Sequence, residues 1–464
     1  MKTLMPKKKK QKIKKNNLAA KDKKYLWHPF TQMKDWQKET PVIIKSARGV
    51  WLEDTEGRRY LDGVSSLWCN VHGHQVPAID DAVRAQLNKV AHSTFLGLSN
   101  IPAIELAEKL IKIAPKGLTR VFYSDSGSES VEIALKMAFQ YWRQIGKPEK
   151  QKFIKLTNSY HGDTLGSVSV GGISLFHEIY EPLLFHSFSV SSPYAYRWPG
   201  VLSLGDAGAQ SLVQLEEILK NHHQEIAAFV MEPVMQGAAG MINQPQGYIS
   251  RARELTRKYN VLLIFDEVAT GFGRTGTMFA ADRERVAPDL MCAAKGITGG
   301  YLPLAVTFST EEIYKGFLGK YEEFKTFFHG HTYTANPLAC AAALASLELF
   351  RKNKILKKIQ PKIHLMKKRL KDFYNLSSVG DIRQEGLMAG IELVRNRKTG
   401  EPFDAKEKIG AKVIERARNK GVMLRPLGSV VVLMPPLVIS DKELNLLLDV
   451  TYESIDETIK GIEL

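Results

Sequence analysis

The sequence contains few cysteines and no long apolar run. Its three cysteines, Cys69, Cys292 and Cys340, lie far apart among 464 residues. They indicate neither a disulfide framework nor a zinc-binding spacing, and such usage is typical of a reducing compartment. No stretch of about 18 consecutive apolar residues occurs, which argues against a transmembrane helix. We therefore expect a cytoplasmic protein without a membrane partner.

Acidic residues are outnumbered, but the imbalance is local. The formal net charge is +16, and residues 1–24 alone carry +10 through eleven lysines and one aspartate. The remaining 440 residues thus carry only +6. No aromatic residues are interleaved with the lysines, and no apolar core typical of a signal peptide follows. We predict a solvated, disordered arm in residues 1–24 and no nucleic-acid partner, with weak polyanion attraction as the alternative.

The rest of the composition is ordinary. Hydrophobic residues make up 44% and charged residues 25% of the chain, as in a soluble globular protein. A chain of 464 residues exceeds one usual core, so two domains are expected.

The most informative stretch is residues 261–301, in which two apolar segments each end on a charged side chain. Residues 261–265 precede Asp266, and residues 290–294 precede Lys295 and a glycine-rich turn. Buried parallel strands present functional groups at their carboxyl ends. An acid beside a desolvated lysine suits pyridoxal phosphate, because the lysine can form a Schiff base while the acid keeps the ring nitrogen protonated. A helix-capping acid and a solvated lysine are the alternative.

A second stretch predicts a phosphate-binding helix start. Gly127 and Ser128 follow a short apolar strand, and Ser126 and Glu129 have the spacing of a capping box. Glycine lets the backbone approach a ligand, and the free N–H groups of the first turn attract an anion. An ordinary capped helix has the same pattern.

Polar residues also follow other apolar segments. Tyr160 comes at a strand end, where its ring could stack on a flat cofactor. Glu232 and Gln236 follow the apolar residues 226–231. Arg425 is isolated in an apolar neighbourhood, which suggests that it binds a carboxylate.

Four segments together carry a family resemblance: SDSGSESVEIALKMA, YHGDT, DEVATGFGRTG and KGITGG. They resemble the class III, fold type I aminotransferases, and the similarity extends from about Tyr25 to the end. The resemblance implies pyridoxal 5'-phosphate as cofactor and a homodimer as the active unit. It also implies an α/β fold, in which a large domain with a mostly parallel seven-stranded sheet accompanies a smaller α/β domain from both chain ends. The expected division is 1–24 tail, 25–75 small domain, 76–345 large domain and 346–464 small domain.

The same resemblance implies residue roles. Lys295 would be the Schiff-base lysine and the proton shuttle, and no metal is implied. The implied cofactor-binding residues are Gly127, Ser128, Tyr160, Asp266, Lys295, His331 and Thr332, the last reaching the phosphate from the neighbouring subunit. The implied substrate-binding residues are Phe30, Trp68, Tyr160, Lys295, Gly330 and Arg425, with Asp163, Glu232 and Gln236 placed around them.

Three further motifs narrow the resemblance: WHPFTQM, SSLWCNVHGH, and LRPLG with LMPPL. They are similar to family members that convert 8-amino-7-oxononanoate to 7,8-diaminononanoate in biotin biosynthesis. S-adenosyl-L-methionine is the commoner amino donor of such members. Members that use it often have two tyrosines and a second tryptophan where this chain has Phe30, Val432 and Leu67. Lysine-using members look similar at these positions, so lysine stands as the second expected donor.

Other functions share parts of this pattern. Class III enzymes acting on ornithine, 4-aminobutyrate or a β-amino acid would have the same cofactor residues. A glutamate-semialdehyde mutase would need no external donor, and the aromatic segment near Tyr25 argues against it. A polyanion-binding protein on an inactive transaminase fold is a remote alternative, since Lys295 and Asp266 would then have no role.

Overall fold

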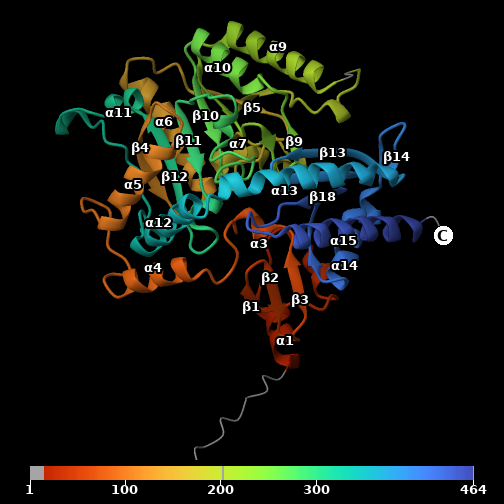
Figure 1. Ribbon diagram of the computed structural model, residues 1–464. Coiled ribbons are helices and arrows are strands. Elements are labelled where there is room, and N and C mark those ends of the chain that lie inside the picture. The colour runs from red at the N-terminus through yellow and green to blue at the C-terminus, as the bar shows by residue number, and fades with distance from the viewer. Residues whose placement is uncertain (1–14, 201–202, 463–464) are drawn as a thin grey trace, which may run out of the picture.

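The computed structural model describes residues 15–200 and 203–462 (Figure 1). Its centre is a seven-stranded sheet with the order β4-β12-β11-β10-β7-β5-β6. Only the pairs that β12 makes with β11 and β4 are antiparallel, which confirms the mostly parallel sheet predicted for the large domain. The strands are β4 (Leu118–Ser124), β5 (Lys152–Leu156), β6 (Ser187–Val190), β7 (Ile226–Met231), β10 (Leu262–Asp266), β11 (Leu290–Ala293) and β12 (Ala305–Thr310).

Helices cover both faces of this sheet, because side chains alternate between the faces along each strand. On β10, Leu262 and Ile264 join an apolar cluster with residues of α6, whereas Leu263 and Phe265 join residues of α5, α9 and α10. Every residue of β7 and β10 is buried, as expected for strands covered on two sides. The main large-domain helices are α4 (Pro77–Leu87), α5 (Ile101–Ile113), α6 (Gly127–Gln144), α9 (Leu204–His222), α10 (Tyr248–Lys258) and α12 (Pro337–Lys352).

Both ends of the chain build the remaining structure. Strand β3 pairs with β16, so the N-terminal hairpin strands extend a sheet that C-terminal residues complete. In Figure 1 the red strands accordingly lie beside the blue helices α14 and α15. A second sheet has the order β13-β14-β18-β17, with β15 on β14. These elements are β1 (Ile44–Arg48), β2 (Trp51–Asp54), β3 (Arg59–Asp62), β13 (Val379–Glu385), β14 (Met388–Asn396), β15 (Glu401–Pro402), β16 (Val422–Met423), β17 (Arg425–Leu427), β18 (Val430–Leu433), α13 (Ile355–Leu370), α14 (Ile409–Asn419) and α15 (Asp441–Lys460).

The shorter elements occupy connections between these layers. They are α2 (Met33–Trp36), α3 (Ser65–Trp68), α7 (Leu165–Ser169), α8 (Ser174–His177), α11 (Glu311–Gly316) and the hairpin of β8 (Met235–Gln236) and β9 (Ile242–Asn243).

The start of the chain differs from the prediction of a disordered tail that extends to residue 24. Helix α1 (Lys15–Tyr25) is followed by a turn that is tied back to it. Asp22 accepts a hydrogen bond of 2.8 Å from the Trp36 indole and lies 3.1 Å from His28 Nε2. Because these contacts come from residues later in the chain, the lysine-rich pattern did not reveal them. The rest of the predicted tail, residues 1–14, lies outside the described residues.

None of the helices within the described ranges combines the length and the apolar character needed to cross a membrane.

Candidate active site

A cavity of 640 Å³ lies at the carboxyl edge of the central sheet. Five strands deliver polar groups to it, because parallel strands end at the same edge. Gly127 follows β4, Tyr160 follows β5, Glu232 follows β7, Asp266 ends β10, and Lys295 follows β11. The structure therefore brings together the groups that sequence reasoning placed at separate strand ends.

Strand pairing sets the positions of Asp266 and Lys295. Asp266 is in register with Cys292 on the neighbouring strand, three residues before Lys295. The Lys295 backbone has a φ of 45°, an unusual value for a non-glycine residue that points to a constrained functional position. Its Nζ lies 5.3 Å from the centre of the Trp68 ring. Desolvation lowers the pKa of Lys295, and the carboxylates of Asp266 and Glu232 oppose that shift.

Asp266 is held by two hydrogen bonds. Its Oδ2 lies 2.7 Å from His161 Nδ1, and its Oδ1 accepts from the Val268 backbone N–H at 3.0 Å. Sequence reasoning quoted His161 within YHGDT but assigned it no role, and it did not single out Val268, which lines the cavity. His161 lies in YHGDT, and Asp266 and Val268 lie in DEVATGFGRTG, so all three residues belong to recognised motifs. The contact between His161 and Asp266 is not evident from the sequence because 105 residues separate them.

The start of α6 offers a binding site for a phosphate. Ser126 and Glu129 form the predicted capping box, which orients the first turn. The backbone N–H groups of Gly127 and Ser128 find no acceptor within the described parts of the chain, and both residues line the cavity. A Cβ at Gly162 would collide with the Ser128 side chain, so the neighbouring loop approaches as closely as glycine allows. Free donors at a helix start are suited to an anion.

Tyr160 and its neighbours form one wall. The Tyr160 hydroxyl donates to Asp163 Oδ2 at 2.7 Å, and burial raises the pKa of Tyr160. The backbone N–H of Tyr160 donates to Glu232 Oε1 at 3.1 Å. Gln236 is buried and donates to the Thr157 carbonyl at 2.8 Å. Asp163 and Glu232 thus line the cavity and also hold Tyr160 in place, and Gln236 supports the neighbouring loop.

Glu232 is a buried acid whose ionisation should weaken the fold. Burial, followed by the charge of Asp266, raises its pKa to about 7 against the opposing effect of His161. When an acid has a higher pKa in the folded state than in the unfolded state, the free energy of unfolding falls as pH rises from the unfolded-state pKa to the folded-state pKa. We therefore expect the free energy of unfolding of Glu232→Gln, relative to the parent protein, to increase between pH 5 and 8 by about 2 to 3 kcal/mol. Denaturant unfolding of both proteins at several pH values measures this difference, and a pH-independent difference would contradict it.

Trp68 closes the opposite side of the cavity. Its backbone φ is 64°, and Ser65 and Ser66 also have positive φ values, which marks a strained turn. Only 6% of Trp68 is exposed, and it packs in a cluster that includes Met235, Met241, Met388 and Met434. Methionines adapt their shape readily, so this wall can accommodate different ligands.

Several predicted residues do not line the cavity in this chain. Phe30 is 59% exposed and contacts Phe176, whose ring in turn contacts Tyr160. Gly330 and Thr332 are exposed. Arg425 is half-buried on β17, and its charge lowers the pKa of Tyr160, so it lies near that wall. The substrate and cofactor roles of these residues remain predictions.

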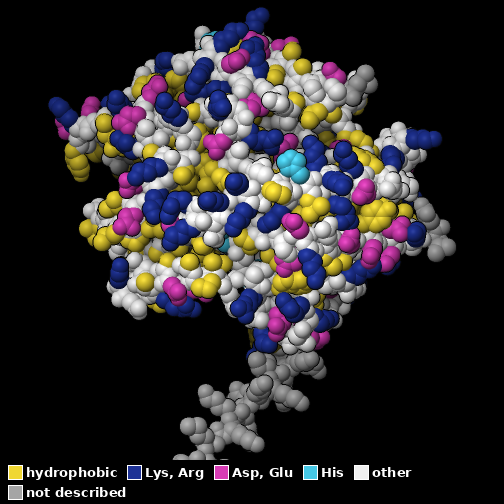
Figure 2. All heavy atoms as spheres, in the orientation of Figure 1, with side chains coloured by type: hydrophobic (Ala, Val, Ile, Leu, Met, Phe, Trp, Pro, Cys, Tyr) yellow, Lys and Arg dark blue, Asp and Glu magenta, His cyan; other side chains and the backbone are white. Residues whose placement is uncertain are grey.

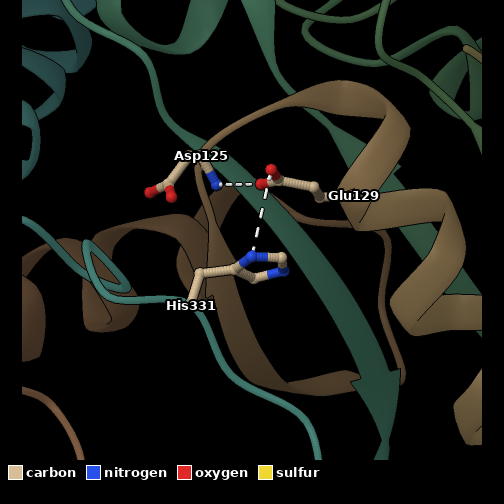
Figure 3. A group of neighbouring side chains, drawn as sticks. All are labelled: Asp125, Glu129 and His331. Atoms are coloured by element: carbon tan, nitrogen blue, oxygen red, sulfur yellow. Dashed lines mark hydrogen bonds and ion pairs between the residues drawn. The ribbon is translucent and has the colours of Figure 1, made fainter. Parts of the chain in front are cut away.

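His331 lies at the edge of the site, beside the start of α6 (Figure 3). Asp125, Glu129 and His331 place one possible metal-ligand atom each within 4.8 Å of one another. However, one Glu129 oxygen already accepts the Asp125 and Ser126 N–H groups at 2.8 and 3.0 Å. Figure 3 also shows the Asp125 carboxylate pointing away from Glu129. The Glu129 carboxylate therefore serves to fix the start of α6.

Comparison with known proteins agrees with this geometry. The family model "Aminotransferase class-III" matches residues 32–455. The adenosylmethionine-8-amino-7-oxononanoate aminotransferase of Geobacter sulfurreducens is 52% identical over 441 residues, covering 95% of this chain and 97% of that protein.

Solved structures match over nearly the whole chain as well. The crystal structure of adenosylmethionine-8-amino-7-oxononanoate aminotransferase from Methanocaldococcus jannaschii has a TM-score of 0.91 at 46% identity, covering 96% of this chain and 99% of that one. The omega transaminase from Pseudomonas jessenii in complex with PMP has a TM-score of 0.92 at 32% identity, with the same coverage.

Proposed function

The chain belongs to the class III aminotransferases, which depend on pyridoxal phosphate, and we propose that it aminates 8-amino-7-oxononanoate to 7,8-diaminononanoate in biotin biosynthesis. The observation that carries this proposal is the 52% identity over 95% of the chain to a relative named for that substrate. The motifs WHPFTQM and SSLWCNVHGH support the same substrate. S-adenosyl-L-methionine is the proposed donor, and lysine is the alternative because of Phe30, Leu67 and Val432.

The residues of the cavity fit pyridoxal phosphate. Lys295 has no hydrogen-bond acceptor among the described residues and opens onto the cavity, where it can bind the aldehyde covalently. The free N–H groups of Gly127 and Ser128 would hold the phosphate. Asp266, oriented by His161, would face the ring nitrogen. When bound, the cofactor supplies an electron sink for the carbanion that forms on losing a substrate proton.

The protein groups supply orientation and proton transfer. Desolvation lowers the pKa of Lys295, so more of its amine is unprotonated and able to take a proton from the substrate carbon. His161 restricts the Asp266 carboxylate to one orientation through their 2.7 Å contact. Tyr160, held by Asp163, limits where the substrate can lie above the site. Arg425 is half-buried and forms no ion pair with another described residue, so it would bind the carboxylate of the substrate.

The exposed apolar surface supports a homodimer as the active unit. Leu96, Tyr321 and Phe328 are 91%, 93% and 71% exposed. They lie in the segments that precede α5 and follow α11, over which apolar side chains gather at the left of Figure 2. A patch of this kind on a single chain is typical of an interface. In a dimer related by a two-fold axis, the nearby Thr332 of one subunit would reach the phosphate site of the other.

The cysteines support a reducing compartment. Cys69, Cys292 and Cys340 are all free, and the last two are buried. The proposed location is therefore the cytoplasm.

The donor is tested by the first half of the reaction. Purified protein carrying its cofactor is mixed with S-adenosyl-L-methionine or with lysine, without acceptor, and the absorbance of the bound cofactor is followed. We expect S-adenosyl-L-methionine to convert the cofactor fully and lysine to leave it unchanged. After donor removal, 8-amino-7-oxononanoate should restore the original absorbance.

The other outcomes separate the alternatives. Conversion by lysine alone would keep the substrate and replace the donor. Conversion only by ornithine, 4-aminobutyrate or a β-amino acid would contradict the proposed substrate, while leaving the aminotransferase assignment intact.

A further inference from the structure

One stripe of α6 holds a long connection in place. Gln144 and Gln140 donate from Nε2 to the carbonyls of Lys325 and Thr326, both at 3.0 Å. Lys136, which lies four residues before Gln140 on the helix, donates to His329 Nδ1 at 2.9 Å. Residues 325–334 therefore run along α6 towards its N-terminus, the end that faces the cavity.

The last contacts of this segment form a chain in which Lys136, His329 and His331 are joined by two hydrogen bonds and His331 then approaches Glu129. His329 Nε2 lies 2.9 Å from His331 Nε2, and His331 Nδ1 lies 3.9 Å from Glu129 Oε1. In Figure 3 the His331 ring lies directly beside the Glu129 carboxylate. Phe327 stacks on His329 at 5.7 Å and fixes the plane of that ring.

The donors determine where the protons are. A lysine ammonium only donates, so His329 Nδ1 must accept and the His329 proton must be on Nε2. His331 Nε2 must then accept from His329, which places the His331 proton on Nδ1, facing Glu129. An additional proton has no place in this chain. On His329 Nδ1 it would face the Lys136 ammonium, and on His331 Nε2 it would face the His329 N–H.

We propose that His329 and His331 position residues 325–334 on α6 through a hydrogen-bond chain that accepts no further proton, so that acidification releases the segment. The two histidines are positioning residues, since neither lines the cavity. Gly330 and Thr332 are carried by the same segment. The consequence for the cofactor rests on the proposed homodimer, in which Thr332 reaches the partner's phosphate site.

Burial and the neighbouring Lys136 favour the neutral form of His329, although Glu132 and Glu129 oppose them. Burial lowers the pKa of His329 from its ordinary value of 6.5, and Lys136 and His331 lower it further. A base whose pKa is lower in the held segment than in the released segment does not weaken the held state while pH is above the released-segment pKa. As pH falls from that pKa through the lower one, the released segment takes up the proton more readily, and release is favoured. The change is therefore expected below about pH 6.5. The charged and titratable groups facing the pair are Lys136, Glu129, Glu132 and Asp125.

Hydrogen exchange of residues 325–334 in the cofactor-loaded protein tests the proposal, after correction for the intrinsic effect of pH. Protection should fall roughly fivefold between pH 7.5 and 5.5, as expected when a hydrogen bond is lost. His329→Gln keeps an Nε2 donor but cannot titrate, so its protection should be equal at both pH values. His329→Ala should be poorly protected at both. His364→Gln, which changes an exposed histidine on α13, is the matched control and should behave as the parent.

Equal protection of the parent protein at the two pH values would overturn the proposal, as would a persistent pH effect in His329→Gln. Cofactor release after dilution, measured on the same proteins, distinguishes this failure from failure of the homodimer. Faster release from His329→Ala would agree with both proposals. Loss of protection in His329→Ala without faster release would uphold the histidine pair and contradict the placement of Thr332.

Discussion

Replacing Lys295 with alanine is expected to abolish transamination, with a loss in kcat of at least about a thousandfold. Burial lowers the pKa of Lys295, and no other lysine among the described residues lines the cavity to take over its proton transfer. The variant should still bind pyridoxal phosphate without a covalent bond, because the free N–H groups at the start of α6 and the Asp266 carboxylate remain. Turnover with the best donor measures the first effect. The absorbance of cofactor that stays with the variant in gel filtration measures the second, and mass spectrometry after borohydride reduction should show no covalent adduct.

Lys155→Ala is the matched control for this experiment. Lys155 is also a lysine with a pKa lowered by burial, but it donates to the carbonyls of Ser169 and Gly171 and lies outside the cavity. Its removal should reduce stability and leave turnover of the folded protein close to that of the parent. Normal turnover in Lys295→Ala would remove the central assignment of this site.

The cofactor site was largely predictable from the sequence because its signals are local. Each apolar run that ends on a polar residue identifies a strand and its exit, which is how Asp266, Lys295 and Glu232 were found. The capping box at Ser126 likewise lies within four consecutive residues and forms as expected. A parallel sheet then brings these exits together without further information, since all its strands end at one edge.

Contacts across long sequence separations were not predictable. His161 and Asp266 are 105 residues apart, and neither residue type by itself indicates the other. The strain of the turn at Trp68 follows from the surrounding packing rather than from the SSLW sequence. The lysines near the N-terminus favoured disorder up to residue 24, but Asp22 is held by Trp36, a contact that composition does not encode.

The segment along α6 illustrates the same limit. Gln140 and Gln144 are typical of any solvent-facing helix surface, and the family resemblance implied a cofactor contact for His331 and a substrate contact for Gly330. Only the structure shows that the glutamines hold the backbone of Lys325 and Thr326, and that His331 meets Glu129. Residues chosen for cofactor contacts by resemblance can thus have a structural role within their own chain in addition.

The second large effect is expected from Arg425, which lies near the cavity wall that Tyr160 forms. Arg425 projects from β17, which pairs with β18 through Val432, and it is half-buried without an ion-pair partner in the described residues. Such an arginine is costly to bury unless a ligand supplies the opposite charge. Its electrostatic effect on Tyr160 places that charge close to the site.

Arg425→Ala should therefore weaken binding of 8-amino-7-oxononanoate by about 2 kcal/mol, which corresponds to a rise in KM of about 30-fold. The kcat should change much less, because the guanidinium binds the carboxylate end and not the reacting carbon. Arg425→Lys keeps the charge but loses the bidentate geometry, so an intermediate KM is expected. Arg395→Ala, which removes an exposed arginine paired with Glu407 in the same domain, is the control. Steady-state kinetics with saturating donor give both constants, and a KM equal to that of the Arg395 variant would place the substrate carboxylate elsewhere.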